Sequence, residues 1–331
     1  MHALPAHAIE LKGLRKTYAA RGKQPAKEAL KGVDLAIPRG SVFGLLGPNG
    51  AGKSTLINIL AGLVKKTGGT AQVFGIDIDR HPRRARRAIG VVPQELNLDA
   101  FFTPRETLEL QAGLYGVPKA ERATDAILEA VGLADKADAY ARSLSGGMRR
   151  RLLVAKALVH RPPVVILDEP TAGVDVELRR SLWAYMKELN GKGVTVVLTT
   201  HYLEEAEQMC DRIAIIDRGT VVASDTKEEL MHRIDEKELV LTLEQPCTVI
   251  PEALAAWDCT LGPTGRLSIR YRPSNANVGR ILDAVRGAGL VIRDLQTREA
   301  DLEDIFIRLT GHEPEPAPDP VPADAVAEIT P

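Results

Sequence analysis

The pattern of apolar and polar positions predicts alternating strands and helices over the first two thirds of the chain. Short apolar or β-branched runs bounded by Gly and Pro lie at 33–37, 41–46 and 71–75, and they favour strands. Residues 53–63 instead predict a helix, because four apolar side chains recur there at helical spacing on one face: Leu56, Ile59, Leu60 and Leu63. A strand, a Gly-rich turn and a helix are therefore expected in succession over 41–63.

The segment 103–159 is predicted to be helical. It opens with Thr103-Pro-Arg-Glu106, a capping box with proline at the first helical position. Further along, nearly continuous apolar runs at 163–167 and 194–200 are typical of buried parallel strands. Helical segments, expected at 176–190 and 201–209, alternate with these strands. This alternation predicts an α/β fold in which helices cover both faces of a parallel sheet.

The character of the chain changes after about residue 232. KELVLTLEQP and RLSIRYRP favour strands, whereas ANVGRILDAVRGAG and READLEDIFIRLTG favour helices. We therefore expect a first domain over 1–232 and a small α+β module over 237–311. The tail 313–331 holds six prolines, five acids and no base, so we expect it to be disordered.

Composition narrows the functional classes. The 331 residues include 43 Lys and Arg against 44 Asp and Glu, a net charge of −1, which argues against bulk electrostatic binding of nucleic acid. Three cysteines are too few and too scattered for a disulfide framework or a zinc site, which fits a reduced, cytosolic setting. No apolar run is long enough for a signal peptide or a membrane span. We expect the chain to act at a membrane only through a partner.

A phosphate-binding loop is the strongest chemical motif. Residues 47–55 match the pattern G-x-x-x-x-G-K-[ST] between a predicted strand and a predicted helix: Gly47, Pro48, Asn49, Gly50, Ala51, Gly52, Lys53, Ser54 and Thr55. The glycines let backbone N–H groups curve around phosphate oxygens, and the helix directs its positive end at the anion. Lys53 is expected to reach the β- and γ-phosphates, and Ser54 to offer a hydroxyl to Mg²⁺.

Two further motifs suit the same chemistry. VVILDEP at 164–170 places Asp168 and Glu169 at the end of a buried strand, where an open α/β sheet binds ligands. Asp168 suits a Mg²⁺ ligand and Glu169 could polarise an attacking water; a pair held by local N–H groups is the structural alternative. LSGGM at 144–148 precedes an apolar helix and could form a second anion nest, or simply a serine N-cap.

Together these motifs resemble the ATP-binding subunits of ABC transporters. The loop at 47–55, LSGGM, VVILDEP, AGVD at 172–175 and TTH at 199–201 occur in the order and at the spacings of that family, over about residues 7–232. The resemblance implies a P-loop NTPase core, with a parallel sheet and an antiparallel β edge. It also implies an inserted helical subdomain at about 95–160.

The resemblance also implies roles for individual residues. Tyr18 matches the aromatic that stacks on adenine, Gln94 the glutamine that contacts Mg²⁺ and the lytic water, and His201 the histidine at the γ-phosphate. Asp168 matches the Mg²⁺-associated aspartate and Glu169 the catalytic base. Ser145, Gly146 and Gly147 match the signature that closes over the nucleotide of the opposite subunit. Asp175 matches the aspartate that couples the two sites.

The implied function is an ATPase subunit of an exporter. Two copies form a homodimer that binds two ATP with Mg²⁺, closes, and moves an integral membrane permease encoded as a separate chain; the subunit lies at the cytoplasmic face of the plasma membrane. Met148 and AGVD depart from the commonest family motifs, but both are similar to the daunorubicin-resistance-like and YadG-like exporter branch, as is DLEDIFIRLTG. The alternatives are an importer ATPase and a soluble ABC ATPase acting on ribosomes or DNA.

Two arginine-rich runs lie outside these motifs. The run 80–87 holds five arginines and could contact phosphate groups or simply form a solvated face. Arg149–Arg151 lie at a predicted helix start, where the helix dipole disfavours positive charge. We therefore hypothesise an attractive partner for them, such as nucleotide phosphate or an acidic patch on the permease.

Overall fold

The computed structural model describes residues 4–20, 22, 25–171, 176–200, 202–232, 237–245, 247–262, 265–299 and 301–312. Contacts divide the chain into two compact units. The first unit comprises the chain up to Lys227 together with the residues from Leu309 onward. The second unit is Glu228–Arg308. Short helices at the two boundaries are α8 (Lys227–His232) and α10 (Leu302–Thr310).

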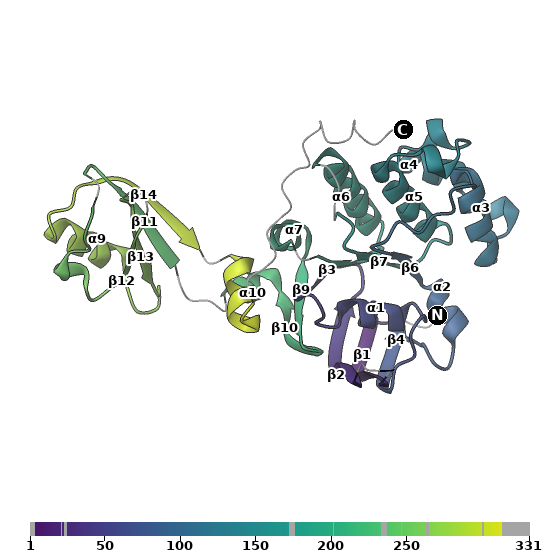
Figure 1. Ribbon diagram of the computed structural model, residues 1–331, viewed down its shortest axis with the longest axis horizontal. Helices are drawn as coiled ribbons and strands as arrows, with labels where there is room; N and C mark the ends of the chain where they lie inside the picture. The colour runs from purple at the N-terminus through teal and green to yellow at the C-terminus, as the bar shows by residue number, and fades with distance from the viewer. Residues whose placement is uncertain are drawn as a thin grey trace. The chain divides into compact units, whose positions relative to one another are not determined.

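A six-stranded sheet forms the centre of the first unit (Figure 1). Its strands follow the order β10 (Thr220–Thr226), β9 (Arg212–Asp217), β3 (Val42–Leu46), β8 (Thr195–Thr199), β7 (Val164–Asp168) and β6 (Ile89–Val92). The neighbours from β9 to β6 pair in parallel, and β10 runs antiparallel to β9. β3 is buried at every position, as expected of a strand with both faces covered.

An antiparallel sheet and one helix cover one face of this sheet (Figure 1). The sheet order is β2 (Lys27–Pro38), β1 (His7–Tyr18), β4 (Gly68–Val73) and β5 (Ile76–Asp77), and α1 (Lys53–Leu60) lies between the two sheets. Ile9, Leu56 and Ile166 meet in this layer and are almost fully buried. Burying each such side chain contributes roughly 1.5–3 kcal/mol, so this layer holds the start of α1 in place.

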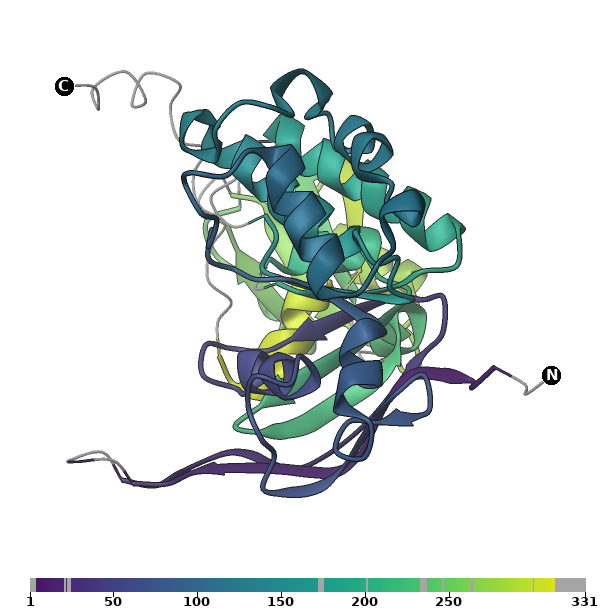
Figure 2. The ribbon, with the colours of Figure 1, turned by 90° about the vertical axis from the view of Figure 1, so that its right-hand side faces the viewer.

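Helices cover the opposite face (Figure 2). They are α3 (Pro104–Leu114), α4 (Thr124–Ala130), α5 (Gly146–Leu158) and α6 (Val176–Gly191). The short helix α2 (Pro82–Arg87) contacts β5 and β6, and α7 (Leu203–Met209) contacts β3. Single 3₁₀ turns lie at Lys119–Glu121, Ala134–Lys136 and Ala141–Ser143. The helices α3, α4 and α5 share their own apolar core, in which Leu108, Leu128 and Leu152 are 1% exposed or less. The P-loop core with a helical insert is confirmed.

Local sequence patterns predict the start of α3 correctly but not the end of α1. Thr103 and Glu106 form both bonds of the predicted capping box at the start of α3. The prediction that the first helix extends to Leu63 is wrong. The helix ends at Leu60, and Leu63 is 76% exposed, because Gly62 adopts a left-handed conformation at φ 74° and terminates the helix.

The second unit contains a four-stranded antiparallel sheet. Its order is β12 (Asp258–Leu261), β13 (Leu267–Tyr271), β11 (Lys237–Leu243) and β14 (Ile292–Glu299). α9 (Val278–Gly287) and a 3₁₀ turn at Glu252–Leu254 complete the apolar core around Leu239, Leu241 and Ile269. The predicted strands and helices of this region are present; the expected disordered tail at 313–331 lies outside the described residues.

β6 and α5 approach each other closely at Gly90. A Cβ on this glycine would lie 2.2 Å from the Ala157 carbonyl oxygen and 3.0 Å from Cγ of Pro162. We expect Gly90→Ala to lower the free energy of unfolding by about 1–3 kcal/mol, since backbone would have to move to admit a methyl group. Urea denaturation of the purified chain measures this effect.

Gly113 in α3 supplies the matched control. A Cβ there would meet only Nη2 of Arg122, at 3.4 Å. Gly113→Ala should be neutral or stabilising by up to about 1 kcal/mol, because alanine favours helix over glycine. Equal stability losses in the two variants would show that the contact between β6 and α5 is not tight.

Candidate functional site

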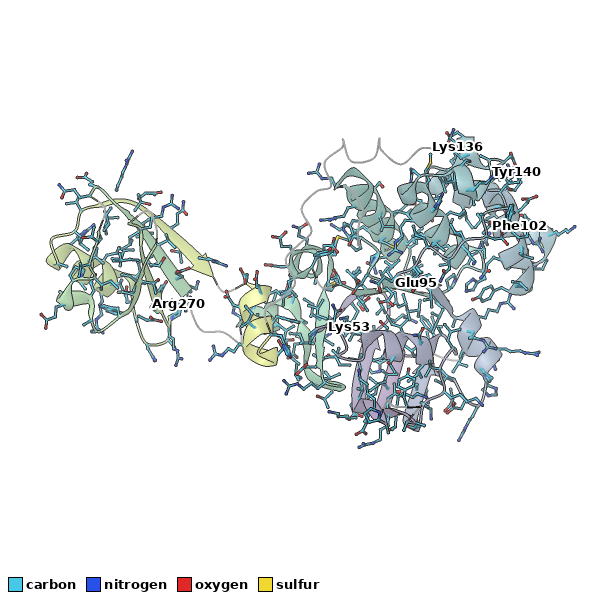
Figure 3. The ribbon with its side chains drawn as sticks, in the orientation of Figure 1. Lys53, Glu95, Phe102, Lys136, Tyr140 and Arg270 are labelled. Carbon is cyan, nitrogen blue, oxygen red and sulfur yellow. The ribbon has the colours of Figure 1, made fainter. Side chains whose placement is uncertain are left out.

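The carboxyl ends of β3, β6 and β7 meet around a cavity of about 400 Å³. Its lining includes most of the nucleotide-binding residues predicted from the sequence, together with two residues of β2: Tyr18, Lys27, Ala29, Pro48, Asn49, Gly50, Ala51, Gly52, Lys53, Ser54, Thr55, Gln94 and Glu169. Figure 3 shows Lys53 and Glu95 near the middle of the first unit, while Phe102, Lys136 and Tyr140 lie in its helical layer.

The two ends of the loop at 47–52 pack closely against strands β9 and β2, and neither Gly47 nor Gly52 has room for a side chain. A Cβ on Gly47 would lie 2.1 Å from the Ile216 carbonyl oxygen of β9, and one on Gly52 would lie 2.8 Å from the Ala29 carbonyl oxygen of β2. Both glycines also have positive φ, at 156° and 116°. Glycine is therefore required at both positions on steric grounds, and Gly52 on conformational grounds as well.

Lys53 begins α1 and is 6% exposed. Its Nζ donates to the carbonyl oxygens of Gly47 at 2.5 Å and Pro48 at 3.3 Å. The ammonium group thus lies inside the curve of the loop, beside the amino end of the helix. Both features favour an anion in the cavity. Ser54 is exposed at the next position.

Tyr18 is the last residue of β1, pairs with Lys27 of β2, and is 39% exposed. The ammonium group of Lys16 lies 4.6 Å from the centre of its ring. The ring thus forms one wall of the cavity and offers an aromatic surface on which a planar base could stack. Its placement agrees with the sequence prediction, while its role remains a proposal.

Gln94 and Glu169 lie together although they are far apart in the sequence. Nε2 of Gln94 donates to Oε2 of Glu169 at 2.7 Å. Glu169 has φ 46°, a conformation that costs a non-glycine residue about 1–3 kcal/mol, and backbone strain of this kind is concentrated at functional sites. Its N–H donates to the Thr199 carbonyl oxygen at 3.1 Å, which helps to hold this conformation.

Asp168 ends β7 behind Glu169. Thr199 Oγ1 of β8 donates to its Oδ1 at 2.6 Å. Burial raises the pKa of Asp168, and the bond from Thr199 opposes that shift by favouring the carboxylate. Thr199 also offers its hydroxyl oxygen to the Glu169 N–H at 3.1 Å. It therefore organises both carboxylate residues, a function that the sequence prediction missed although TTH contained it.

The signature residues do not line this cavity. Ser145 is the N-cap of α5, and its Oγ accepts from the Met148 N–H at 3.3 Å. Ser145 and Gly146 are exposed, and Gly147 is half-buried. The serine N-cap that the sequence offered as an alternative is therefore present; a function toward another chain is a separate proposal. Asp175 and His201 lie outside the described residues.

The arginines after the signature have partners within the chain. Arg149 donates to the carbonyl oxygens of Ala141 and Arg142, and Arg151 donates to those of Val131 and Gly132. Arg150 donates to five carbonyl oxygens of the strand-end loops. The hypothesis that these charges need an external partner is therefore unnecessary. Within the run 80–87, Pro82–Arg87 forms α2, and all five arginines of the run, at 80, 83, 84, 86 and 87, are exposed.

The buried carboxylate of Glu205 joins the segments that follow β7 and β8. Glu205 of α7 is 6% exposed and accepts from the hydroxyls of Thr171 at 2.7 Å and Thr200 at 3.2 Å. Nε of Arg179 lies 3.3 Å from its other oxygen. We expect Glu205→Ala to lower the free energy of unfolding by about 3 kcal/mol, because these donors lose their acceptor. Urea denaturation measures the change.

Glu204 is the matched control, since it is exposed and directly precedes Glu205 in α7. Glu204→Ala should alter the free energy of unfolding by no more than about 0.5 kcal/mol. A similarly small change in Glu205→Ala would contradict a stabilising function for the buried carboxylate.

Comparison with known proteins agrees with this geometry. Residues 30–172 match the family described as "ABC transporter". The chain is 38% identical to the daunorubicin/doxorubicin resistance ATP-binding protein DrrA of Streptomyces peucetius, over 99% of both chains. It is 37% identical to the Nod factor export ATP-binding protein I of Ralstonia nicotianae, over 92% of this chain and 94% of that one. It is 36% identical to the linearmycin resistance ATP-binding protein LnrL of Bacillus subtilis, over 92% and 98%.

Solved structures resemble about two thirds of the chain. An ATP-binding subunit of an ABC transporter superimposes with a TM-score of 0.62 at 30% identity, covering 68% of this chain and 92% of that one. A dimeric bacterial ABC transporter cassette superimposes with a TM-score of 0.59 at 32% identity, covering 66% and 98%. The curated relatives, in contrast, match nearly the whole length of this chain.

Proposed function

Because the chain belongs to the ATP-binding subunits of ABC transporters, we propose that it powers export through a separate membrane permease by binding and hydrolysing ATP. The observation that carries this proposal is the single cavity in which the phosphate loop, Tyr18, Gln94 and Glu169 converge. The export direction rests on relatives that match at least 92% of the chain and are named for export or drug resistance.

The lining of the cavity defines the orientation proposed for ATP. Its phosphates would lie in the loop at 47–55, next to Lys53 and the start of α1, and its adenine would stack on Tyr18. Ser54, Gln94 and Asp168 offer oxygen ligands of the type that Mg²⁺ takes beside phosphates. Bound Mg²⁺ would neutralise the charge that develops on the transferred phosphoryl group.

Glu169 is the proposed general base. Its carboxylate lines the cavity and is oriented by Gln94 at 2.7 Å, so it can take a proton from a water aligned with the γ-phosphate. Lys53 would stabilise the phosphate oxygens by charge. His201 would contact the γ-phosphate from the end of β8. Most of the catalysis in such a site comes from positioning and charge stabilisation.

A second copy of the chain would complete each site. Ser145–Gly147 are at the amino end of α5 and outside the cavity of their own chain. In a homodimer with two ATP, each signature would close over the nucleotide of the opposite subunit, and Asp175 would couple the two sites. Relatives with a dimeric solved structure support this arrangement.

The permease partner would place the subunit at the cytoplasmic face of the membrane. In the part of the chain that the structure describes, no helix combines the length and apolar character that crossing a bilayer requires. A groove of about 360 Å³ is lined by Leu63, Val91, Pro93, Tyr115 and Leu153, with Arg86 and Lys156 also present. This lining suits a permease segment whose apolar side chains fill the groove and whose acidic side chains pair with Arg86 and Lys156. Because Pro93 directly precedes Gln94, a segment bound here would adjoin the catalytic site.

We predict that Glu169→Gln keeps its affinity for ATP but loses at least about 100-fold in turnover, because the amide cannot accept the proton of the water. The uncleaved nucleotide should then hold two chains together. Phosphate release and size-exclusion chromatography with ATP and Mg²⁺ measure the two effects.

Glu95→Gln is the control for this experiment, since Glu95 lies beside Gln94 but its carboxylate accepts from Asn97 at 3.2 Å. It should hydrolyse ATP like the wild type. Lys53→Ala, in contrast, should neither bind ATP nor dimerise. Near-normal turnover in Glu169→Gln would refute the assignment of the base.

We predict that Leu63→Arg releases the chain from membranes in cells that produce it with its permease. Leu63 is 76% exposed at the groove, and a third positive charge beside Arg86 and Lys156 would have to be desolvated against the apolar part of the partner. The membrane-bound fraction should fall at least about fivefold, while the ATPase activity of the purified chain stays unchanged.

Leu4→Arg is the control, because Leu4 is also exposed, at 70%, but does not line the groove. If Leu63→Arg sediments with membranes as the wild type does, the groove is not the permease site. If the wild-type chain sediments with ribosomes instead of membranes, the proposal that it powers export is refuted.

A further inference from the structure

A buried guanidinium connects the two catalytic loops of the chain. Arg150 of α5 is 4% exposed. Its Nη1 donates to the carbonyl oxygens of Pro93 and Gln94, both at 2.8 Å. Its Nε donates to that of Pro170 at 2.9 Å, and its Nη2 to those of Asp168 at 3.4 Å and Glu169. One rigid, planar group thus holds the backbone on both sides of the pair formed by Gln94 and Glu169.

The position of these bonds matters for chemistry. The backbone atoms that Arg150 holds belong to Gln94 and Glu169 themselves or to their direct neighbours, and their side chains meet at 2.7 Å in the cavity. Displacing either loop by about 1 Å would misplace the proposed base and can cost about 100-fold in rate. Arg150 lies behind the loops and is absent from the cavity lining, so it does not contact the nucleotide.

The same residue belongs to the helix that carries the signature. Ser145 caps α5, and Arg150 lies between one and two turns into it. The helix is also tightly packed on β6, where a Cβ on Gly90 would lie 2.2 Å from the Ala157 carbonyl oxygen. α5 therefore connects, as one rigid element, the signature at its amino end with the loops that follow β6 and β7.

We propose that Arg150 is a positioning residue that couples the signature of each subunit to the catalytic loops of that same subunit. This inference rests on the proposed function, in which Ser145–Gly147 contact the nucleotide of the opposite chain. When the signature of one chain closes on that nucleotide, α5 and Arg150 hold Gln94 and Glu169 of the same chain in the geometry for hydrolysis. Each site thereby responds to occupancy of the other.

Steady-state ATPase kinetics of the purified full-length chain test this proposal. Arg150→Gln should lower kcat at least about tenfold while KM and ATP affinity change less than about threefold, because the phosphate loop and Tyr18 are left intact and only the loops that carry Gln94 and Glu169 lose their support. The Hill coefficient for ATP should fall toward 1. Arg150→Lys should be intermediate in kcat, since three donors on a flexible stem replace five in a planar fork.

Arg149→Gln is the matched control, because Arg149 is the preceding residue and, within the described residues, donates to the carbonyl oxygens of Ala141 and Arg142 and not to the catalytic loops. It should change kcat and the Hill coefficient less than about twofold. A general loss of folded protein would lower the active fraction without altering cooperativity, so the Hill coefficient separates positioning from a structural role.

Three results would overturn the proposal: wild-type kcat in Arg150→Gln, an equal loss in Arg149→Gln, or an unchanged Hill coefficient. If Arg150→Gln does not fold, Arg150→Lys decides, and wild-type kcat and cooperativity in that variant overturn the inference. A wild-type chain that neither binds nor hydrolyses ATP would instead refute the proposed function.

Discussion

Four parallel strands of the central sheet end at the same edge, and the candidate site depends on this constraint. β3 leads into the phosphate loop, β6 leads to Gln94, β7 ends in Asp168 and Glu169, and β8 ends in Thr199. The phosphate loop, Gln94 and Glu169 thus line one cavity, and Gln94, Glu169 and Thr199 lie within hydrogen-bond distance of one another in turn, although the chain separates them widely. The open edge of a doubly covered sheet is where α/β proteins bind ligands, because loops there are free to differ while the strands stay fixed.

Local features of this architecture could be predicted from the sequence. The phosphate loop and the capping box at Thr103 depend on contacts within a few residues, and the structure contains both. Buried strands such as β7 and β8 are recognisable because both faces are covered and the runs are nearly all apolar. The family, confirmed by relatives that match nearly the whole chain, follows from five motifs at their proper spacing.

Contacts between distant segments could not be predicted in the same way. Arg150 donates to the Pro93 carbonyl oxygen across 57 residues, and Glu205 accepts from Thr171 across 34. Their sequence neighbourhoods, a row of three arginines and a pair of glutamates, do not distinguish the buried residue from the exposed one. Which arginine or glutamate is buried depends on how α5 and α7 pack against the sheet, and the local sequence does not contain that information. The prediction that the first helix reaches Leu63 is wrong because the helical spacing of apolar residues continues past Gly62, where the helix terminates.

The N-cap of α5 determines how the signature serine can meet a ligand. One lone pair of the exposed Ser145 oxygen accepts the Met148 N–H, which leaves the rotatable O–H able to donate to an incoming group. Facing an incoming anion, this serine can therefore donate a hydrogen bond together with the N–H groups of the two glycines that follow it at the helix start. The surface that α5 presents at this end therefore favours oxygen atoms that carry negative charge over cations.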